Sequence, residues 1–255
     1  MRVALVTGGA QGIGCAAAVA LARAGYGVAI ADLDSDGAAD VARAITRSGG
    51  AAIGVGADVS REEDWPAILG AVAQLGRLEA LVSNAGIFPR IAFADCSVAN
   101  FDRVFAVNLK AAFIGASLCL PLMRERGGAM VFMTSGSGLM RSVHNPMQRG
   151  FSLYGASKAA LDRWALGIAQ ELAPVGLAVN VLGPGAPVLT RGFEKLGLGA
   201  EAPSQTITPE RVAEAIVHLA GARPPETGAR YVATEFGESW GRTSARTASH
   251  SASKA

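Results

Sequence analysis

The sequence predicts an α/β fold in which a doubly wound parallel sheet forms a single domain. Short apolar segments alternate along the chain with longer alanine-rich segments of helical period, which is typical of βαβ units. Half of the 255 residues are hydrophobic, enough to cover a sheet that is buried on both faces. No long linker rich in proline, serine or charge interrupts residues 1–240, which favours one domain over two.

The strands are predicted where the apolar runs are short and bounded by glycine or polar residues. In chain order these are residues 2–8, 27–32, 51–59, 78–86, 129–134 and 177–185. Helical period predicts helices between them at 14–26, 36–49, 61–76, 100–126 and 153–173. The last two have apolar faces larger than one sheet face needs, so they predict subunit packing. Residues 241–255 have no periodicity and are expected to be a disordered tail.

Composition excludes several classes of function. The net charge is +2 and the basic residues are scattered, so nucleic acid is not an expected partner. No stretch approaches 18 uninterrupted apolar residues, and we expect a cytoplasmic protein without a membrane partner. Cys15, Cys96 and Cys119 lack a CxxC spacing and are expected to be free thiols. The three histidines form no metal-binding pattern, so no metal site is predicted.

A glycine-rich loop follows the first predicted strand. The segment "TGGAQGIG" places Gly8, Gly12 and Gly14, with Gln11 and Ile13 among them, directly before a helix. Glycines let a backbone turn sharply and approach a pyrophosphate, whose charge is stabilised by the free N–H groups of a helix N-terminus. A simple tight turn is the alternative, but the strand before and the helix after favour a dinucleotide cradle.

An acidic residue ends the second predicted strand. Asp32, followed by Leu33, lies close to the distance of about 20 residues past the glycines at which a carboxylate meets the adenosine ribose hydroxyls. A carboxylate there accepts hydrogen bonds from the diol and repels a 2′-phosphate, so the predicted cofactor is NAD rather than NADP. The alternative is that Asp32 only caps the next helix.

A tyrosine and a lysine stand one helical turn apart in "LYGASK". Positions i and i+4 share a helix face, so the charge of Lys158 can lie near the hydroxyl of Tyr154. A nearby cation favours the phenolate and lowers the pKa of the phenol, which suits Tyr154 to general acid–base catalysis. For the isolated pattern, the commoner interpretation is a packed ring beside a lysine that reaches solvent.

Taken together in this order, TGxxxGxG, the strand-terminal aspartate, "NAG" and YxxxK resemble the short-chain dehydrogenase/reductase family over roughly residues 1 to 221. The resemblance implies a Rossmann-type fold and reversible hydride transfer between NAD and a small secondary alcohol, hydroxy acid, sugar or ketone. It implies that Asp58 and Val59 contact the adenine and that Asn84, Ala85 and Gly86 border the cofactor. Asn108 matches the family's helix asparagine, which holds a water in a proton relay.

The catalytic serine has two possible positions. The family's usual spacing before the tyrosine points to Arg141, whereas alignment of the strand "GGAMVFMTSGSG" points to Ser135, with Ser137 as an alternate. We favour Ser135, because a loop absorbs inserted residues more easily than a strand shifts its register. The loop between Ser135 and Tyr154 then carries an insertion.

The same resemblance assigns the remaining site residues and the mechanism. Pro184 and Gly185 match the turn near the nicotinamide, and Thr190 is the best match for the threonine that contacts its carboxamide. Ser135 is implied to hold the substrate oxygen and Tyr154 to exchange its proton. Lys158 is implied to lower the tyrosine pKa and bind the nicotinamide ribose. A homotetramer built through the two long helices is also implied.

Two questions stay open at the level of the sequence. A dinucleotide-binding sensor or scaffold without catalysis is the rival to a dehydrogenase, because the serine spacing is unusual. The expected partner is a small-molecule substrate, and its identity is unknown. The loops predicted to border the pocket contain guanidinium groups and a histidine that can receive an anion, although solvated loop charges are the alternative: Arg90, Arg141, His144, Arg149 and Arg191.

Overall fold

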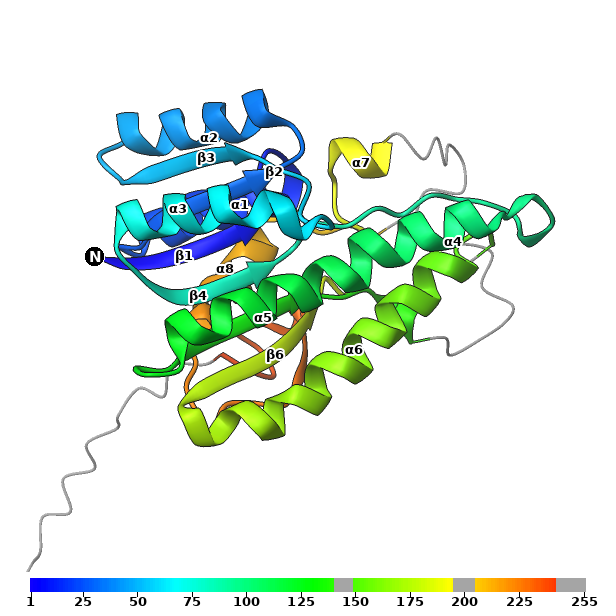
Figure 1. Cartoon of the computed structure of the whole chain (residues 1–255). Coiled ribbons are helices and arrows are strands. Elements are labelled where there is room, and N and C mark those ends of the chain that lie inside the picture. The colour runs from blue at the N-terminus through cyan, green and yellow to red at the C-terminus, as the bar shows by residue number, and fades with distance from the viewer. Residues whose placement is uncertain (140–148, 195–204, 242–255) are drawn as a thin grey trace, which may run out of the picture.

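The structure is a computed structural model that describes residues 1–139, 149–194 and 205–241. These residues form a seven-stranded, entirely parallel sheet in the order β3-β2-β1-β4-β5-β6-β7 (Figure 1). The strands are β1 (Arg2–Thr7), β2 (Gly27–Asp32), β3 (Ala52–Gly56), β4 (Arg77–Ser83), β5 (Gly128–Met133), β6 (Leu177–Gly183) and β7 (Arg230–Val232). The predicted strands are all present, and β7 is an addition that the sequence pattern did not reveal.

Helices cover both faces of the sheet, as predicted. One face carries α1 (Gly12–Arg23), α2 (Ser35–Arg47) and α8 (Pro209–Ala220). The other carries α3 (Trp65–Leu75), α5 (Ala111–Met123) and α6 (Ser152–Leu172) (Figure 1). A short helix, α7 (Arg191–Glu194), follows β6, while α4 (Val98–Phe105) leads into α5.

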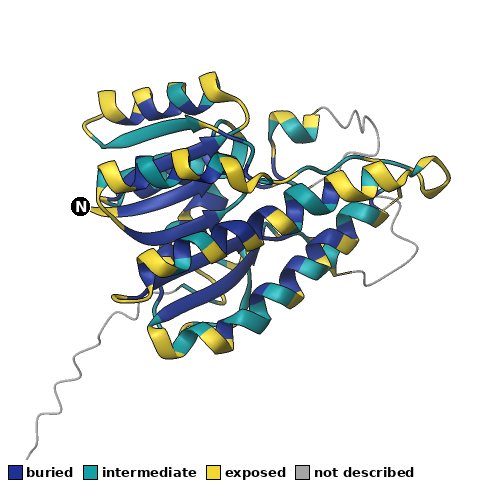
Figure 2. Ribbon diagram, in the orientation of Figure 1, coloured by how far each residue is buried: buried dark blue, intermediate teal, exposed yellow. Residues whose placement is uncertain are grey.

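The central strands are buried along almost their whole length (Figure 2). Because helices pack on both faces, alternate residues of one strand enter two different cores. Leu5 of β1 lies in the core beneath α3, α5 and α6, whereas its neighbour Val6 lies in the core beneath α1, α2 and α8. The apolar runs in the sequence therefore reflect double-sided burial.

The long helix predicted at residues 100–126 is not a uniform α-helix. Between α4 and α5 the backbone forms a π-helical segment, η3 (Ala106–Lys110). The stretch Val98–Met123 is long and apolar enough to cross a membrane by length and composition, and an 18-residue window in it has a mean hydropathy of 1.6. In the structure it runs beside β4 and α6 as a layer of the fold.

The order of the strands places a binding crevice. The chain runs outward from β1 to β2 and β3, then crosses back so that β4 pairs with the other edge of β1. Loops at the carboxyl ends of β1 and β4 therefore diverge to opposite faces, which opens a crevice between them. The predicted tail at 241–255 lies, except for its first residue, outside the described residues.

Candidate active site

A cavity of about 940 Å³ lies at the carboxyl ends of the strands. Its walls come from loops that are far apart in the sequence, from Gly8 after β1 to Thr190 after β6. The predicted cofactor residues line it, with the exception of Gly14: Gly8, Gln11, Gly12, Ile13, Asp32, Leu33, Asp58, Val59, Asn84, Ala85, Gly86, Tyr154, Lys158, Pro184, Gly185 and Thr190. The fold thus brings the predicted set together around one space.

The glycine loop is shaped as the phosphate cradle requires. Gly8 has φ +67°, a conformation that other residues rarely adopt. Gly14 does not line the cavity because it packs beneath the loop, where a Cβ atom would lie 2.0 Å from the carbonyl oxygen of Gly8. The N-cap of α1, Gln11, makes no side-chain capping bond, so the first N–H groups of the helix stay available to an anion.

Asp32 is held by the backbone on both oxygen atoms. Oδ2 accepts a hydrogen bond from the N–H of Ala10 at 2.9 Å, and Oδ1 accepts one from the N–H of Asp34 at 3.0 Å. It is Asp34 that caps α2, by accepting from the N–H of Gly37 at 3.0 Å. The carboxylate of Asp32 is therefore fixed at the cavity wall. The residue that caps α2 is Asp34, not Asp32.

Two further loops are braced by side chains. Asn84 donates from Nδ2 to the carbonyl oxygens of Thr7 and Gly8, at 3.1 and 2.9 Å, which ties the β4 loop to the glycine loop. Asp58 turns its carboxylate toward its own loop, where Oδ1 accepts from the N–H and hydroxyl of Ser60. Both residues thus hold the shape of the cavity wall.

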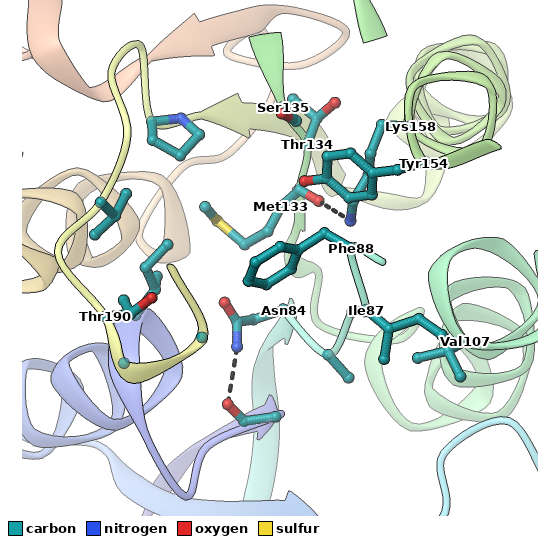
Figure 3. A pocket seen from close by; sticks show the side chains of 18 of the residues that line it. Asn84, Ile87, Phe88, Val107, Met133, Thr134, Ser135, Tyr154, Lys158 and Thr190 are labelled. Carbon is teal, nitrogen blue, oxygen red and sulfur yellow. Dashed lines mark hydrogen bonds between the residues drawn. The ribbon is translucent and has the colours of Figure 1, made fainter. Parts of the chain in front are cut away.

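The serine, tyrosine and lysine meet at one end of the cavity (Figure 3). Ser135 follows β5, and its hydroxyl lies beside the phenol of Tyr154, where it lowers the pKa of that phenol. Tyr154 and Lys158 project from the first turns of α6 toward the end of β5. Ser137 also lines the cavity, and its backbone N–H donates to Oγ of Ser135 at 3.2 Å. The strand alignment thus found the serine that lies beside Tyr154, while Arg141 lies outside the described residues.

Burial dominates the ionisation of the tyrosine–lysine pair. It raises the pKa of Tyr154, and the hydroxyl of Ser135 lowers that pKa only in part. Burial also lowers the pKa of Lys158 to about 8, against the opposing effect of Asp162. The ammonium donates to the carbonyl oxygen of Met133 at 2.8 Å. Desolvation therefore raises the Tyr154 pKa in the protein by itself, and the lowering of this pKa by Lys158 stays a prediction.

Asn108 is buried behind the cavity and does not line it. Its Nδ2 donates to the carbonyl oxygen of Ile87 at 2.8 Å and to Oγ of Ser157 at 2.9 Å, and its Oδ1 accepts from the N–H of Ile87 at 2.8 Å. The side chain therefore fastens the loop after β4 to α6. The relay role of Asn108 stays a prediction.

The turn after β6 closes the cavity above the glycine loop. Gly185 has φ +88°, and a Cβ atom there would lie 2.2 Å from Oγ1 of Thr234. Thr190 accepts the N–H of Phe193 on Oγ1 at 3.2 Å, and its methyl group lies 3.1 Å from where a Cβ atom of Gly12 would stand. Thr190 thus lies at the cavity wall beside Gly12, and its contact with the nicotinamide carboxamide stays a prediction.

The predicted anion-binding residues are only partly described. Arg141 and His144 lie outside the described residues. The side chain of Arg90 donates to the carbonyl oxygen of Arg149 at 3.1 Å, which holds these two segments together. Neither of them, nor Arg191, belongs to the cavity lining, whereas Arg103 of α4 does.

Sequence reasoning missed the aromatic part of the wall. The rings of Phe88 and Phe151 lie 6.0 and 6.1 Å from that of Tyr154, and Phe193 lines the cavity as well. These isolated phenylalanines belong to no periodic segment, so the sequence alone could not assign them to the site. Within the described residues, no group of three or more His, Cys, Asp or Glu side chains is placed to hold a metal.

Comparison with known proteins agrees with this geometry. A family model described as short chain dehydrogenase matches residues 2–198. The chain belongs to the short-chain dehydrogenase family. It is 39% identical over 189 residues to the 4-formylbenzenesulfonate dehydrogenase of Comamonas testosteroni, a match that covers 72% of this chain and 71% of the relative. It is 33% identical over 220 residues to the trans-4-hydroxycyclohexanecarboxylate dehydrogenase of Sinomonas cyclohexanicum, covering 81% and 83%.

A solved structure gives the same fold. A short-chain type dehydrogenase/reductase from Mycobacterium marinum superposes with a TM-score of 0.81 at 30% identity, covering 91% of this chain and 92% of the other. As a short-chain dehydrogenase, this protein is an oxidoreductase that interconverts a hydroxyl and a carbonyl group with a nicotinamide dinucleotide. The glycine cradle, which added side chains would fill, and the uncapped helix N-terminus fit such a group.

Proposed function

We propose that this short-chain dehydrogenase is specific for NAD and acts on a secondary alcohol, or the matching ketone, carried on a ring. The observation that carries the proposal is the meeting of Ser135, Tyr154 and Lys158 at one end of a cavity whose other end holds a fixed carboxylate, Asp32. The rival proposal is a sensor that binds the cofactor without turnover. Such a sensor needs the same cavity but does not need Ser135, Tyr154 and Lys158 to meet.

The preference for NAD rests on Asp32. Its two oxygen atoms are aligned by the N–H groups of Ala10 and Asp34 and face the cavity, where they can accept the hydroxyls of a ribose. A phosphate at the same place meets a like charge that the backbone holds in position. In wild type we expect kcat/KM for NAD to exceed that for NADP by about 100-fold or more. Asp32→Ala should lower this ratio, and a wild-type preference for NADP would refute the assignment.

Ser135, Tyr154 and Lys158 bind the substrate oxygen and transfer its proton. Ser135 donates or accepts a hydrogen bond at the substrate oxygen, and Tyr154 takes the hydroxyl proton as the carbon is oxidised. Lys158 stabilises the phenolate that this transfer needs, because its ammonium lies on the same helix face. A bound NAD supplies the hydride acceptor and the positive charge of the oxidised ring.

The aromatic wall supports a ring substrate. Phe88, Phe151 and Phe193 offer apolar surface beside the phenol of Tyr154, where a flat or puckered ring can pack. Both named relatives act, by their names, on a six-membered ring with an anionic group at the position opposite the reacting carbon group. We therefore propose an anionic ring substrate whose charge is received by Arg103, the arginine of α4 that lines the cavity.

The test is turnover on a panel with NAD or NADH. It contains trans- and cis-4-hydroxycyclohexanecarboxylate, 4-formylbenzenesulfonate, cyclohexanol, and open-chain secondary alcohols, each assayed with wild type and Tyr154→Phe. We expect ring compounds to be preferred and the mutation to abolish turnover while NADH binding persists. Binding without turnover of any compound would support the sensor. An unchanged KM for the anionic substrate in Arg103→Ala would exclude Arg103 as the residue that binds the anion.

Assembly and location remain proposals of the same kind. A groove formed by α4, η3, α5 and α6 is lined by Phe105, Leu109, Phe113 and Trp164, and Phe113 is 54% exposed. This apolar surface supports a homotetramer built through the long helices, and sedimentation as a monomer at micromolar concentration would contradict it. A cytoplasmic location stays a prediction of the sequence.

A further inference from the structure

A buried ion pair lies directly under the catalytic residues. Asp162 stands on α6 one helical turn beyond Lys158, and Arg230 is the first residue of β7. Nε of Arg230 donates to Oδ2 of Asp162 at 3.0 Å, and the two side chains are only 18% and 10% exposed. The partners are far apart in the sequence, so no local pattern predicts their contact.

Arg230 has a second contact, and it reaches the active site. Its Nη2 donates to the carbonyl oxygen of Ser135 at 3.1 Å. The guanidinium occupies space left by a glycine at the end of β6, since a Cβ atom on Gly183 would lie 3.2 Å from Nη2. One planar side chain therefore joins the backbone of the catalytic serine to the helix that carries Tyr154 and Lys158.

Asp162 is linked to Lys158 through its charge. Its Oδ1 is buried without a hydrogen-bond partner in the described part of the chain, and Arg230 neutralises the carboxylate from Oδ2. Around Lys158, the ionisable groups are Tyr154 and Asp162 of α6, with Arg230 beyond Asp162. The groups that η3 and β5 present, the Asn108 amide and the Met133 carbonyl, are neutral. The field of Asp162 opposes the effect of burial on the lysine pKa.

We propose that Asp162 and Arg230 are positioning residues for catalysis: Arg230 fixes the backbone of Ser135, and Asp162 keeps Lys158 charged in its buried site. The proposal rests on the catalytic roles given above to Ser135 and Lys158. A purely structural pair is the alternative, because buried ion pairs often add little to stability. The two alternatives differ in the effect that replacing Asp162 or Arg230 has on the charge of Lys158.

The charge of Lys158 can be followed directly. The sequence has four lysines, Lys110, Lys158, Lys195 and Lys254, so a two-dimensional NMR spectrum of protein labelled with 13C at the lysine Cε contains few signals. Lys158→Met identifies the signal of Lys158, which should titrate near pH 8 in the absence of cofactor. In Asp162→Asn the titration should move to lower pH by about 1 unit. In Arg230→Gln it should move to higher pH, because the carboxylate loses its neutralising partner.

Glu79 provides the matched control. It is a buried carboxylate paired with Arg77 and Arg223 near the opposite end of β4 from Asn84. Glu79→Gln should leave the titration of Lys158 unchanged. Unchanged titration in both Asp162→Asn and Arg230→Gln, or movement in the same direction in both, would overturn the proposal. If a single variant does not fold, the double variant Asp162→Asn/Arg230→Gln replaces it, with a shift to lower pH expected and no shift overturning the charge argument.

The contact with Ser135 is tested by Arg230→Lys, which keeps the charge but loses the planar fork. We expect kcat to fall about 10-fold with the Kd for NADH unchanged. Full activity in Arg230→Lys would overturn the role of Arg230 at Ser135. A failure of the proposed function is distinguishable, because in that case wild type itself would show no turnover that Tyr154→Phe abolishes.

Discussion

Lys158→Met is expected to stabilise the protein at pH 7 although it removes a catalytic group. Burial lowers the pKa of Lys158 from its ordinary value of 10.5 to about 8, with Asp162 opposing. Each pKa unit corresponds to 1.36 kcal/mol of preference for the neutral form. Keeping the ammonium charged in the folded state therefore costs about 3 kcal/mol of stability relative to an unperturbed lysine.

Part of that cost is recovered by contacts that the variant loses. Nζ donates to the carbonyl oxygen of Met133 at 2.8 Å, and such a bond contributes about 1 kcal/mol. Methionine fills a similar volume with a flexible apolar chain. The net gain expected for Lys158→Met at pH 7 is about 1–2 kcal/mol, which corresponds to a rise in Tm of about 4 °C for a chain of this size.

The pH dependence of stability provides a second test of whether Lys158→Met stabilises the protein. Below pH 8 the lysine is protonated in both folded and unfolded chains, so wild type carries the full cost. Between pH 8 and 10.5 the folded protein releases the proton first, the unfolded chain binds more protons, and the stability of wild type rises with pH. The gap between variant and wild type should therefore close over this range.

Thermal unfolding followed by circular dichroism from pH 6 to 10, without cofactor, measures both effects. Lys110→Met is the matched control, because Lys110 is exposed and should give no gap that depends on pH. A variant less stable than wild type at pH 7, or a gap of constant size across the range, would refute the argument that desolvation dominates at Lys158.

Three further outcomes follow from named contacts. Tyr154→Phe should lower kcat about 1,000-fold or more while NADH binding persists. The control is Tyr26→Phe, which removes a distant hydroxyl that donates to the carbonyl oxygen of Ala220. This control should keep full turnover in the same assay. Gly14→Ala should destabilise by about 2 kcal/mol and weaken NADH binding, since its Cβ would collide with Gly8; Gly70→Ala, in α3 with open space around it, should be neutral or stabilising in the same denaturant titration. Trp65→Ala should cost about 3–5 kcal/mol in that titration, because the ring is fully buried, and a loss below 1 kcal/mol would contradict the packing of α3.

The parts of the fold that the sequence predicted are those in which local chemistry decides the structure. Strands buried on both faces appear as apolar runs, and the glycine loop before α1 appears as a motif because only glycine meets its steric limits. The position of Ser135 followed from the register of β5, which the two cores fix on both faces. That register does not depend on the length of the loop between Ser135 and Tyr154, so the unusual spacing did not affect the alignment of the strand.

The parts that the sequence could not predict depend on contacts between distant residues. The π-helical segment η3 contains Asn108, whose amide is bonded to both backbone groups of Ile87. A helical periodicity cannot report such a bond. The strand β7 is three residues long and carries no pattern, although it supplies Arg230 to the active site.

The pKa of Tyr154 cannot be predicted from the YxxxK motif alone. The spacing YxxxK brings a cation to the correct helix face, but the energy of the phenolate depends on how completely α6 is buried against β5 and the loop after β4. Burial makes both the phenolate and the ammonium expensive, so each depends on the groups that compensate it: Ser135 for Tyr154, and Asp162 for Lys158. Because burial also excludes water and strengthens every charge interaction, the cost to stability and the capacity for proton transfer have the same physical origin. A variant that removes the cost to stability should therefore also lose the capacity for proton transfer.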